Sequence, residues 1–151
     1  MCGIAGFVLN SSNINRDLAN INLSKMLKKI KHRGPDNEGQ YVKIINKTLI
    51  GLGHRRLSII DLSDNSNQPT YFENLIMTFN GEIYNYIEIR NKLLKLGYIF
   101  NSSSDTEVII NAYKEWGKSC LDLFNGMFSF AILDQGNESS DKSIFIGRDR
   151  F

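Results

Sequence analysis

Short apolar runs with the alternation of β-strands are separated by segments whose apolar residues recur at helical spacing. Strands are predicted over Gly3–Leu9, Leu75–Asn80, 128–132 and Ser143–Arg148. Residues 38–54 are typical of a β-hairpin whose turn residue, Asn46, tolerates the left-handed conformation. A polar loop is predicted over Asp61–Pro69.

Three helices are predicted between these strands. The first follows Asn15 or Asp17 as N-cap, and its apolar positions are Leu18, Ile21, Met26, Leu27 and Ile30. The second runs from Ile87 to Leu96 and stops at Gly97. The third opens at Ser104, has Glu107 placed as in a capping box, and continues through Trp116. Its predicted apolar face consists of Val108, Ile109, Ala112 and Tyr113.

Strands joined by hairpins, with helices of about 10 to 14 residues between them, favour an α+β domain with antiparallel sheets. The final residues "IFIGRDRF" run directly out of a predicted strand. An uncovered strand edge is a liability that natural domains usually avoid. We therefore expect this chain to be a C-terminally truncated piece of a longer protein.

Composition narrows the functional classes. With 151 residues, 42% hydrophobic and 23% charged, the chain fits one globular domain with a real core. Its net charge is +2, and the lysines of 25–33 alternate with apolar residues at helical spacing, which favours a solvated helix face over a nucleic-acid site. No apolar stretch approaches the ~18 residues of a membrane span.

The two cysteines and two histidines show no metal-ligand spacing, so no metal site is predicted. Cys120 lies in an apolar stretch and is expected in the core. No secretory signal segment is recognisable, because no basic residue precedes the apolar run after Met1. This favours free thiols in a reducing, cytoplasmic environment.

The opening "MCGIAGFVL" raises two interpretations of Cys2. It is a small buried residue of an N-terminal strand, or it is a nucleophile. If Met1 is removed, Cys2 carries a thiol and a free α-amine, whose ordinary pKa of roughly 7.7–8.0 lets it accept the thiol proton directly or through one water. Gly3 would allow the backbone to approach a substrate closely.

A thiolate that attacks a carbonyl needs donors for the oxyanion. In "FNGEIYN", the amide of Asn80 at the end of a strand and the backbone N–H of Gly81 are candidates, although Asn-Gly is also a plain turn former. In the same way, "HRGPD" is interpretable as a turn and Arg55–Arg56 as surface charge.

The order and spacing of several blocks resemble glutamine-hydrolysing asparagine synthetases across essentially the whole chain. The blocks are "MCGIAGF", "HRGPDNEG", "GHRRLSIIDL", "NQP", "FNGEIYNY", "SDTEVII", "LFNGMFSFAI" and "IGRDRF". The resemblance implies that residues 1–151 are a fragment of a class II glutamine amidotransferase (glutaminase) domain. It also implies the N-terminal-nucleophile hydrolase fold, a four-layer αββα sandwich of two antiparallel sheets.

The resemblance also implies roles for individual residues. Cys2 would attack the side-chain amide of L-glutamine, with Asn80 and Gly81 as the oxyanion hole. Arg56 would bind the α-carboxylate and Asp105 the α-ammonium of glutamine. The remaining residues that would line the glutamine pocket are Leu57, Ser58, Ile59, Ile60 and Glu82. His32 and Arg33 match a signature loop with a structural role.

Glutamate and ammonia would be the products, and the ammonia would serve the ATP-dependent conversion of aspartate to asparagine in the full-length protein. The synthetase domain, with its ATP and Mg²⁺, is expected outside this chain, which itself needs no cofactor. A homodimer is a further expectation, whereas nucleic acid and membrane are not expected partners. Two alternatives stay open: the glutaminase domain of a polysaccharide or natural-product amidotransferase, and a non-catalytic domain of the same fold.

Overall fold

Two antiparallel sheets form the centre of the structure, a computed structural model that describes residues 2–10, 15–57, 67–136 and 142–150. The first sheet has the order β1-β3-β2, with strands β1 (Gly3–Asn10), β2 (Asn37–Ile45) and β3 (Thr48–Arg56). The second has the order β4-β5-β6-β7, with strands β4 (Thr70–Phe72), β5 (Leu75–Ile83), β6 (Gly126–Asp134) and β7 (Ser143–Arg148).

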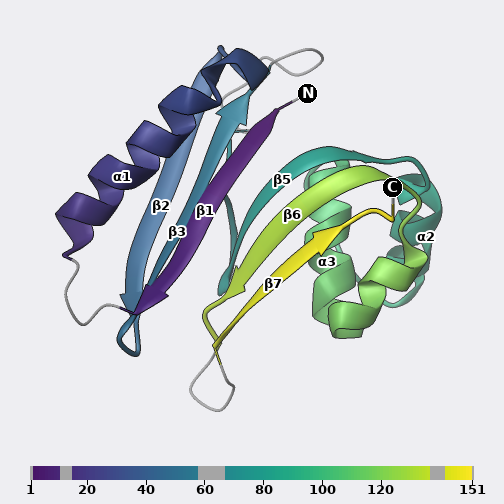
Figure 1. Ribbon diagram of the computed structural model, residues 1–151. Helices are drawn as coiled ribbons and strands as arrows, with labels where there is room; N and C mark the ends of the chain where they lie inside the picture. Colours follow the sequence, from purple (N-terminus) through teal and green to yellow (C-terminus); the bar gives the residue numbers. More distant parts are fainter. Residues whose placement is uncertain (1, 11–14, 58–66, 137–141, 151) are drawn as a thin grey trace.

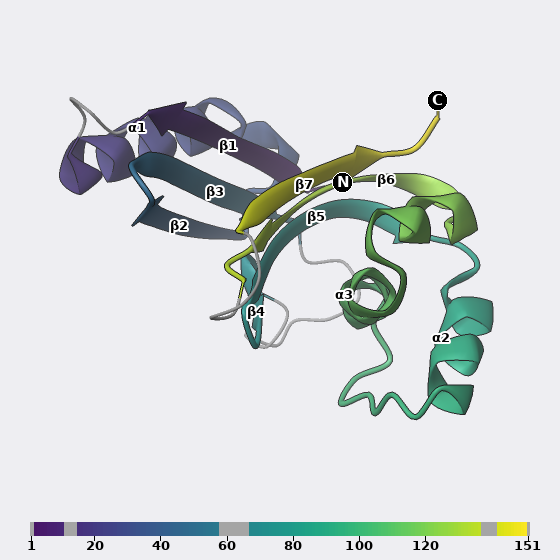
Figure 2. The same cartoon turned by 90° about the horizontal axis from the view of Figure 1, so that it is seen from below.

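Helices cover the outer face of each sheet, while the inner faces pack on one another (Figures 1 and 2). Helix α1 (Arg16–Lys29) lies on the first sheet, and α2 (Tyr86–Lys95) and α3 (Asp105–Trp116) lie on the second. Two short 3₁₀ helices, η2 (Lys31–Arg33) and η4 (Gly117–Leu123), follow α1 and α3. The predicted α+β architecture in four αββα layers is confirmed.

The predicted hairpin is also confirmed. Strands β2 and β3 pair along their whole length, from Ile45 opposite Thr48 to Asn37 opposite Arg56. Asn46 and Lys47 connect them with φ values of 48° and 64°. Positive φ at both central residues is the geometry of the two-residue turn whose twist matches the flanking strands.

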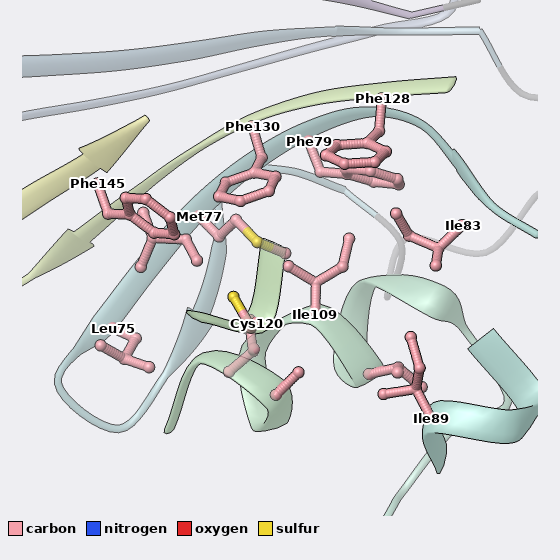
Figure 3. Packing of buried hydrophobic residues seen from close by; sticks show 14 of the residues in the cluster. Leu75, Met77, Phe79, Ile83, Ile89, Ile109, Cys120, Phe128, Phe130 and Phe145 are labelled. Carbon is pink, nitrogen blue, oxygen red and sulfur yellow. The ribbon is translucent and has the colours of Figure 1, made fainter. Parts of the chain in front are cut away.

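Three apolar clusters separate the layers. The one between the sheets is built around Ile50, Leu52, Ile76 and Leu133. The largest lies between the second sheet and α2 and α3, where Met77, Phe130 and Phe145 point toward Ile109 and Cys120 (Figure 3). Cys120 is fully buried there, as predicted.

The predicted apolar face of the first helix is wrong at three of its five positions, whereas Leu27 and Ile30 do pack toward the sheet. The α1 residues that pack on the sheet are Ala19, Leu23 and Leu27, whereas Leu18, Ile21 and Met26 are exposed. Apolar residues occur on two sides of this helix, so spacing alone did not decide between them. The sheet decides, because Gly53 leaves room for Leu27: a Cβ added to Gly53 would lie 3.0 Å from its methyl carbons.

The structure selects Asn15 and not Asp17 as the N-cap of α1, and it confirms Ser104 as the N-cap of α3. The Asn15 side chain accepts from Leu18 N (2.8 Å), and the Ser104 side chain accepts from Glu107 N (3.4 Å). The capping box is only half formed, because the Glu107 carboxylate accepts from the backbone of Asn101 and Ser102 and not from that of Ser104. Glu107 thereby orders the loop that leads into α3.

The corrected helix face generates a stability prediction. Leu23→Ala removes a fully buried side chain and should lower the free energy of unfolding by about 2–5 kcal/mol. Ile21→Ala, on the exposed face of the same helix, should change it by less than about 1 kcal/mol. Denaturant titration followed by circular dichroism measures both, and a larger loss for Ile21→Ala would contradict the observed packing.

Candidate active site

Polar side chains replace apolar ones at one end of the interface between the sheets. Side chains alternate along a strand, so every second residue faces the opposite sheet. On β3 this inner row reads Ile50, Leu52, His54, Arg56, and on β5 it reads Ile76, Thr78, Asn80. Both strands run toward the end of the sandwich at which the N-terminus lies (Figure 1). The apolar interior therefore opens into a polar end beside Cys2.

Cys2 lies next to the last residues of β3. The β1–β3 register pairs Gly3 with Arg55, so one further step places Cys2 opposite Arg56. Leu57 N donates to the Cys2 Sγ (3.4 Å), and the thiol lies 4.0 Å from Leu57 O. Cys2 is half-buried. The backbone of Leu57 thus holds the thiol, beside Arg56, and both residues were predicted to contact glutamine.

The turn after α1 fixes this end of the first sheet. The Arg33 Nε donates to Cys2 O (3.1 Å), which holds the backbone of the candidate nucleophile. The Arg55 Nε donates to Gly34 O (2.9 Å), and a Cβ added to Gly34 would lie 2.4 Å from Arg55 carbonyl atoms. "HRGPD" is therefore a turn, and it is also a brace for Cys2 and β3.

The sequence suggested that Asn80 ends a strand or that Asn80 and Gly81 form a turn. The structure shows neither. Strand β5 continues through Ile83, and Gly81 pairs with Phe128 of β6. Gly81 has φ +139°, and a Cβ added to it would lie 2.1 Å from Met127 O, so glycine is required for two separate reasons. The close approach of β6 lets the strand continue where Asn-Gly alone favours a turn.

The Asn80 side chain has unused hydrogen-bonding capacity. Its Oδ1 atom is buried and receives no hydrogen bond from the part of the chain that the structure describes. The same holds for Nε2 of His54 on the facing strand. Buried polar atoms of this kind are rare in folded proteins, and each needs an explanation. The described residues contain one more, the Nδ2 of Asn111 in α3.

Asp105 joins the start of α3 to the end of β5. Its Oδ2 accepts from Ile83 N (3.1 Å), one residue beyond Glu82. Burial raises the pKa of the Asp105 carboxyl, the hydrogen bonds from Ile83 and Thr106 oppose this, and the charge of Glu82 adds to the rise. The backbone of β5 and of the first turn of α3 thus fixes the position of the Asp105 carboxyl.

The structure thus brings the predicted residues into two groups. Cys2, Arg56 and Leu57 lie at one end of the first sheet, while the second group is on β5 and α3: Asn80, Gly81, Glu82 and Asp105. Ser58, Ile59 and Ile60 lie outside the described residues. Sequence reasoning assigned no role to His54, Asn67 or Gln68, which also lie here. The "NQP" block contains the last two, but its composition alone signals only a loop.

The two thiols differ in environment. Burial raises the pKa of Cys120 to about 12, so that thiol is unreactive near neutral pH.

Within the described ranges, no three His, Cys, Asp or Glu side chains are grouped closely enough to hold a metal ion. Nor does any described helix have the length and apolar character needed to cross a bilayer.

Residues 1–151 match the family described as "Glutamine amidotransferase domain". Among curated relatives, asparagine synthetase [glutamine-hydrolyzing] 1 of Bacillus subtilis is 38% identical over 154 residues, covering 100% of this chain and 23% of the relative. Asparagine synthetase [glutamine-hydrolyzing] of Brassica oleracea is 36% identical over 151 residues, covering 99% of this chain and 24% of the relative. The chain thus spans about a quarter of the length of these relatives.

Among solved structures, glutamine phosphoribosylpyrophosphate amidotransferase from B. subtilis superimposes with a TM-score of 0.66 at 20% identity. The match covers 87% of this chain and 35% of the other. This likeness agrees with the predicted N-terminal-nucleophile hydrolase fold.

The geometry of Gly81 generates a prediction with an internal control. Gly81→Ala combines an unfavourable φ with a backbone collision, and it should lower the free energy of unfolding by more than about 3 kcal/mol. Gly97 also has a positive φ, +92°, but open space surrounds the position of the new methyl group, so Gly97→Ala should cost only about 1–2 kcal/mol. Equal losses in thermal unfolding would show that β6 does not constrain Gly81.

Proposed function

This chain belongs to the glutamine amidotransferase domain family, and we propose that it hydrolyses the side-chain amide of glutamine with Cys2 as nucleophile. The observation that carries the proposal is the placement of the Cys2 thiol against the backbone of Leu57 (Sγ to N 3.4 Å) and beside Arg56. A cysteine kept only for packing would lie in an apolar cluster, as Cys120 does, rather than at the polar end of the sandwich.

The proposed chemistry requires removal of Met1, so that Cys2 becomes the N-terminal residue. The free α-amine takes the thiol proton, and the thiolate sulfur attacks the amide carbon of glutamine to form a C–S bond. The Asn80 amide and the Gly81 N–H stabilise the oxyanion. The amine then gives its proton to the leaving nitrogen, ammonia departs, and water hydrolyses the thioester to glutamate and free thiol.

Substrate recognition follows from the zwitterionic end of glutamine. Its carboxylate pairs with the Arg56 guanidinium, a planar donor suited to two parallel hydrogen bonds. Its ammonium group pairs with the Asp105 carboxylate, which the hydrogen bond from Ile83 N holds in place. Leu57 and Glu82 complete the described part of the pocket, with Ser58, Ile59 and Ile60 as further proposed contacts.

In the whole protein, we propose that the ammonia is used by an ATP- and Mg²⁺-dependent synthetase domain that amidates aspartate. The names of the curated relatives support this acceptor, and their length allows for such a domain. A reducing cytoplasm would keep the Cys2 thiol free for the reaction.

Intact mass measurement tests the nucleophile directly. After expression, the protein should have lost the mass of Met1 and should gain one adduct when treated with an electrophilic glutamine analogue. Excess glutamine should block the adduct, and Cys120 should remain unmodified because burial suppresses its thiolate. An adduct that glutamine does not block, or that maps to Cys120, would contradict the proposal.

Cys2→Ala should abolish glutamine hydrolysis while changing the melting temperature little, because the half-buried thiol makes only weak contacts. Ammonia release and thermal unfolding are the two measurements. Cys120→Ala is the matched control: it should retain hydrolysis but lose stability by about 1–3 kcal/mol, since its side chain is fully buried. Hydrolysis that survives in Cys2→Ala would exclude this mechanism.

Asp105→Asn should raise the KM for glutamine roughly tenfold to a hundredfold, with a much smaller change in kcat. The amide oxygen can still accept from Ile83 N, so the fold is retained while the charge is lost. The raised pKa of Asp105 gives the sign of the pH effect: as pH falls, the carboxyl is neutralised earlier than an ordinary aspartate, and KM rises.

Steady-state kinetics between neutral and mildly acidic pH should therefore show a rising KM in the wild type that Asp105→Asn removes. A kcat effect of the same size as the KM effect would argue that Asp105 acts on the reaction and not on binding of the ammonium group.

A further inference from the structure

Two consecutive side chains that the reaction does not use, Asn67 and Gln68, bridge the two halves of the candidate site. Asn67 contacts the first sheet and Gln68 contacts the second. They precede β4 in the chain and lie beside the polar end of the inter-sheet interface.

Asn67 holds the side chain that is proposed to bind the glutamine carboxylate. Its Oδ1 accepts from the Arg56 Nη1 at 2.9 Å. The Arg56 side chain is nearly buried, so its direction is fixed by neighbours and not by solvent. A long, flexible guanidinium that is fixed before substrate arrives loses less rotamer entropy on binding.

Gln68 holds the backbone immediately before Asn80. Phe79 N donates to the Gln68 Oε1 at 2.6 Å. Strand β4 pairs Thr70 with Met77, and two more steps of that register place Gln68 opposite Phe79. The Gln68 side chain therefore supplies the acceptor that the next backbone carbonyl of a longer β4 would have supplied.

The backbone of this pair is itself fixed against the first sheet. A Cβ added to Gly39 of β2 would lie 1.9 Å from Gln68 O, so the segment rests directly on that strand. Gly39 pairs with His54, which is buried and faces β5. The pair is consequently in contact with β2, β3 and β5 at once.

We propose that Asn67 and Gln68 are positioning residues of the glutamine site: Asn67 orients Arg56 for the substrate carboxylate, and Gln68 sets the position of Asn80 in the oxyanion hole. This inference rests on the proposed function. It separates two effects, because Arg56 acts in binding whereas an oxyanion donor acts in the transition state.

The test uses the full-length protein and steady-state glutamine hydrolysis. Asn67→Ala should raise KM roughly fivefold to tenfold and leave kcat within about threefold, the size expected for one hydrogen bond to a charged group. Gln68→Met should lower kcat roughly tenfold and leave KM within about threefold. This is less than the roughly 10²–10³ lost when an oxyanion donor is removed outright.

Conservative variants separate positioning from general damage. Gln68→Glu keeps an acceptor at the same position and should restore kcat to within about threefold of the wild type. Gln68→Asn, one methylene shorter, withdraws the acceptor and should behave like Gln68→Met, which gives a second test if the methionine variant does not fold. Alkylation of Cys2 by iodoacetamide without glutamine should proceed at the wild-type rate in every variant.

Gln135→Met is the matched control. The Gln135 Oε1 also joins the two sheets, by accepting from Tyr41 and Lys43 on β2, but Gln135 lies beside the β4–β5 turn, where its N–H donates to Asn74 O. Its kinetic constants should not change. Equal effects on kcat and KM in Asn67→Ala and Gln68→Met, or the same effects in Gln135→Met, would overturn the inference. If the wild type is active and Asn67→Ala and Gln68→Met have the same kcat and KM as the wild type, only this inference is overturned. If the wild type does not hydrolyse glutamine, the proposed function is overturned as well.

Discussion

The face-to-face packing of two pleated sheets is the constraint on which the rest of this domain depends. Alternation along each strand forces one row of side chains into the space between the sheets. Over most of that space the row is apolar, with Ile50 and Leu52 packed against Ile76. At one end it becomes polar, and the nucleophile candidate Cys2 lies at that end. The same geometry thus builds both the core and the candidate site.

A polar end between two sheets has to be held in place by something other than apolar burial. Three hydrogen-bonded segments do this here. In the turn after α1, Arg33 donates to Cys2 O, and at the start of α3, Asp105 accepts from Ile83 N. The third segment is Asn67 and Gln68, which accept from Arg56 and Phe79 N. Each is a hydrogen bond to the backbone or to a charged group. Such bonds are directional, and they fix atomic positions more closely than apolar contacts do.

The candidate site concentrates departures from rules that most of the fold obeys. Asn80 and His54 each bury a polar atom that makes no hydrogen bond within the described residues, and Gly81 adopts a conformation that other residues rarely do. Burial also lowers the pKa of His54 to about 4, so it stays neutral beside Arg56. Local departures of this sort are expected where function, and not stability, sets the residue.

The sequence by itself determined most of the elements and the chemistry of single residues, but it predicted neither β4 nor the two 3₁₀ helices. Local features were predictable: the caps at Asn15 and Ser104, the turn at Asn46 and the alternation around Phe130. They depend on interactions and dihedral preferences of residues that are close in the sequence. The possible chemistry of Cys2 follows from its place behind Met1. The resemblance to a family then supplied roles that no local pattern contains.

Only the tertiary structure decided which faces meet. It buried Leu23 and left Ile21 exposed on α1, on the face where Leu27 packs against Gly53 of β3, and it kept Asn80 within a strand because β6 lies against Gly81. It also placed Gln68 beside Phe79 and Asn67 beside Arg56. These are contacts between residues at least 11 positions apart, and they depend on strand register, which local sequence preferences do not specify.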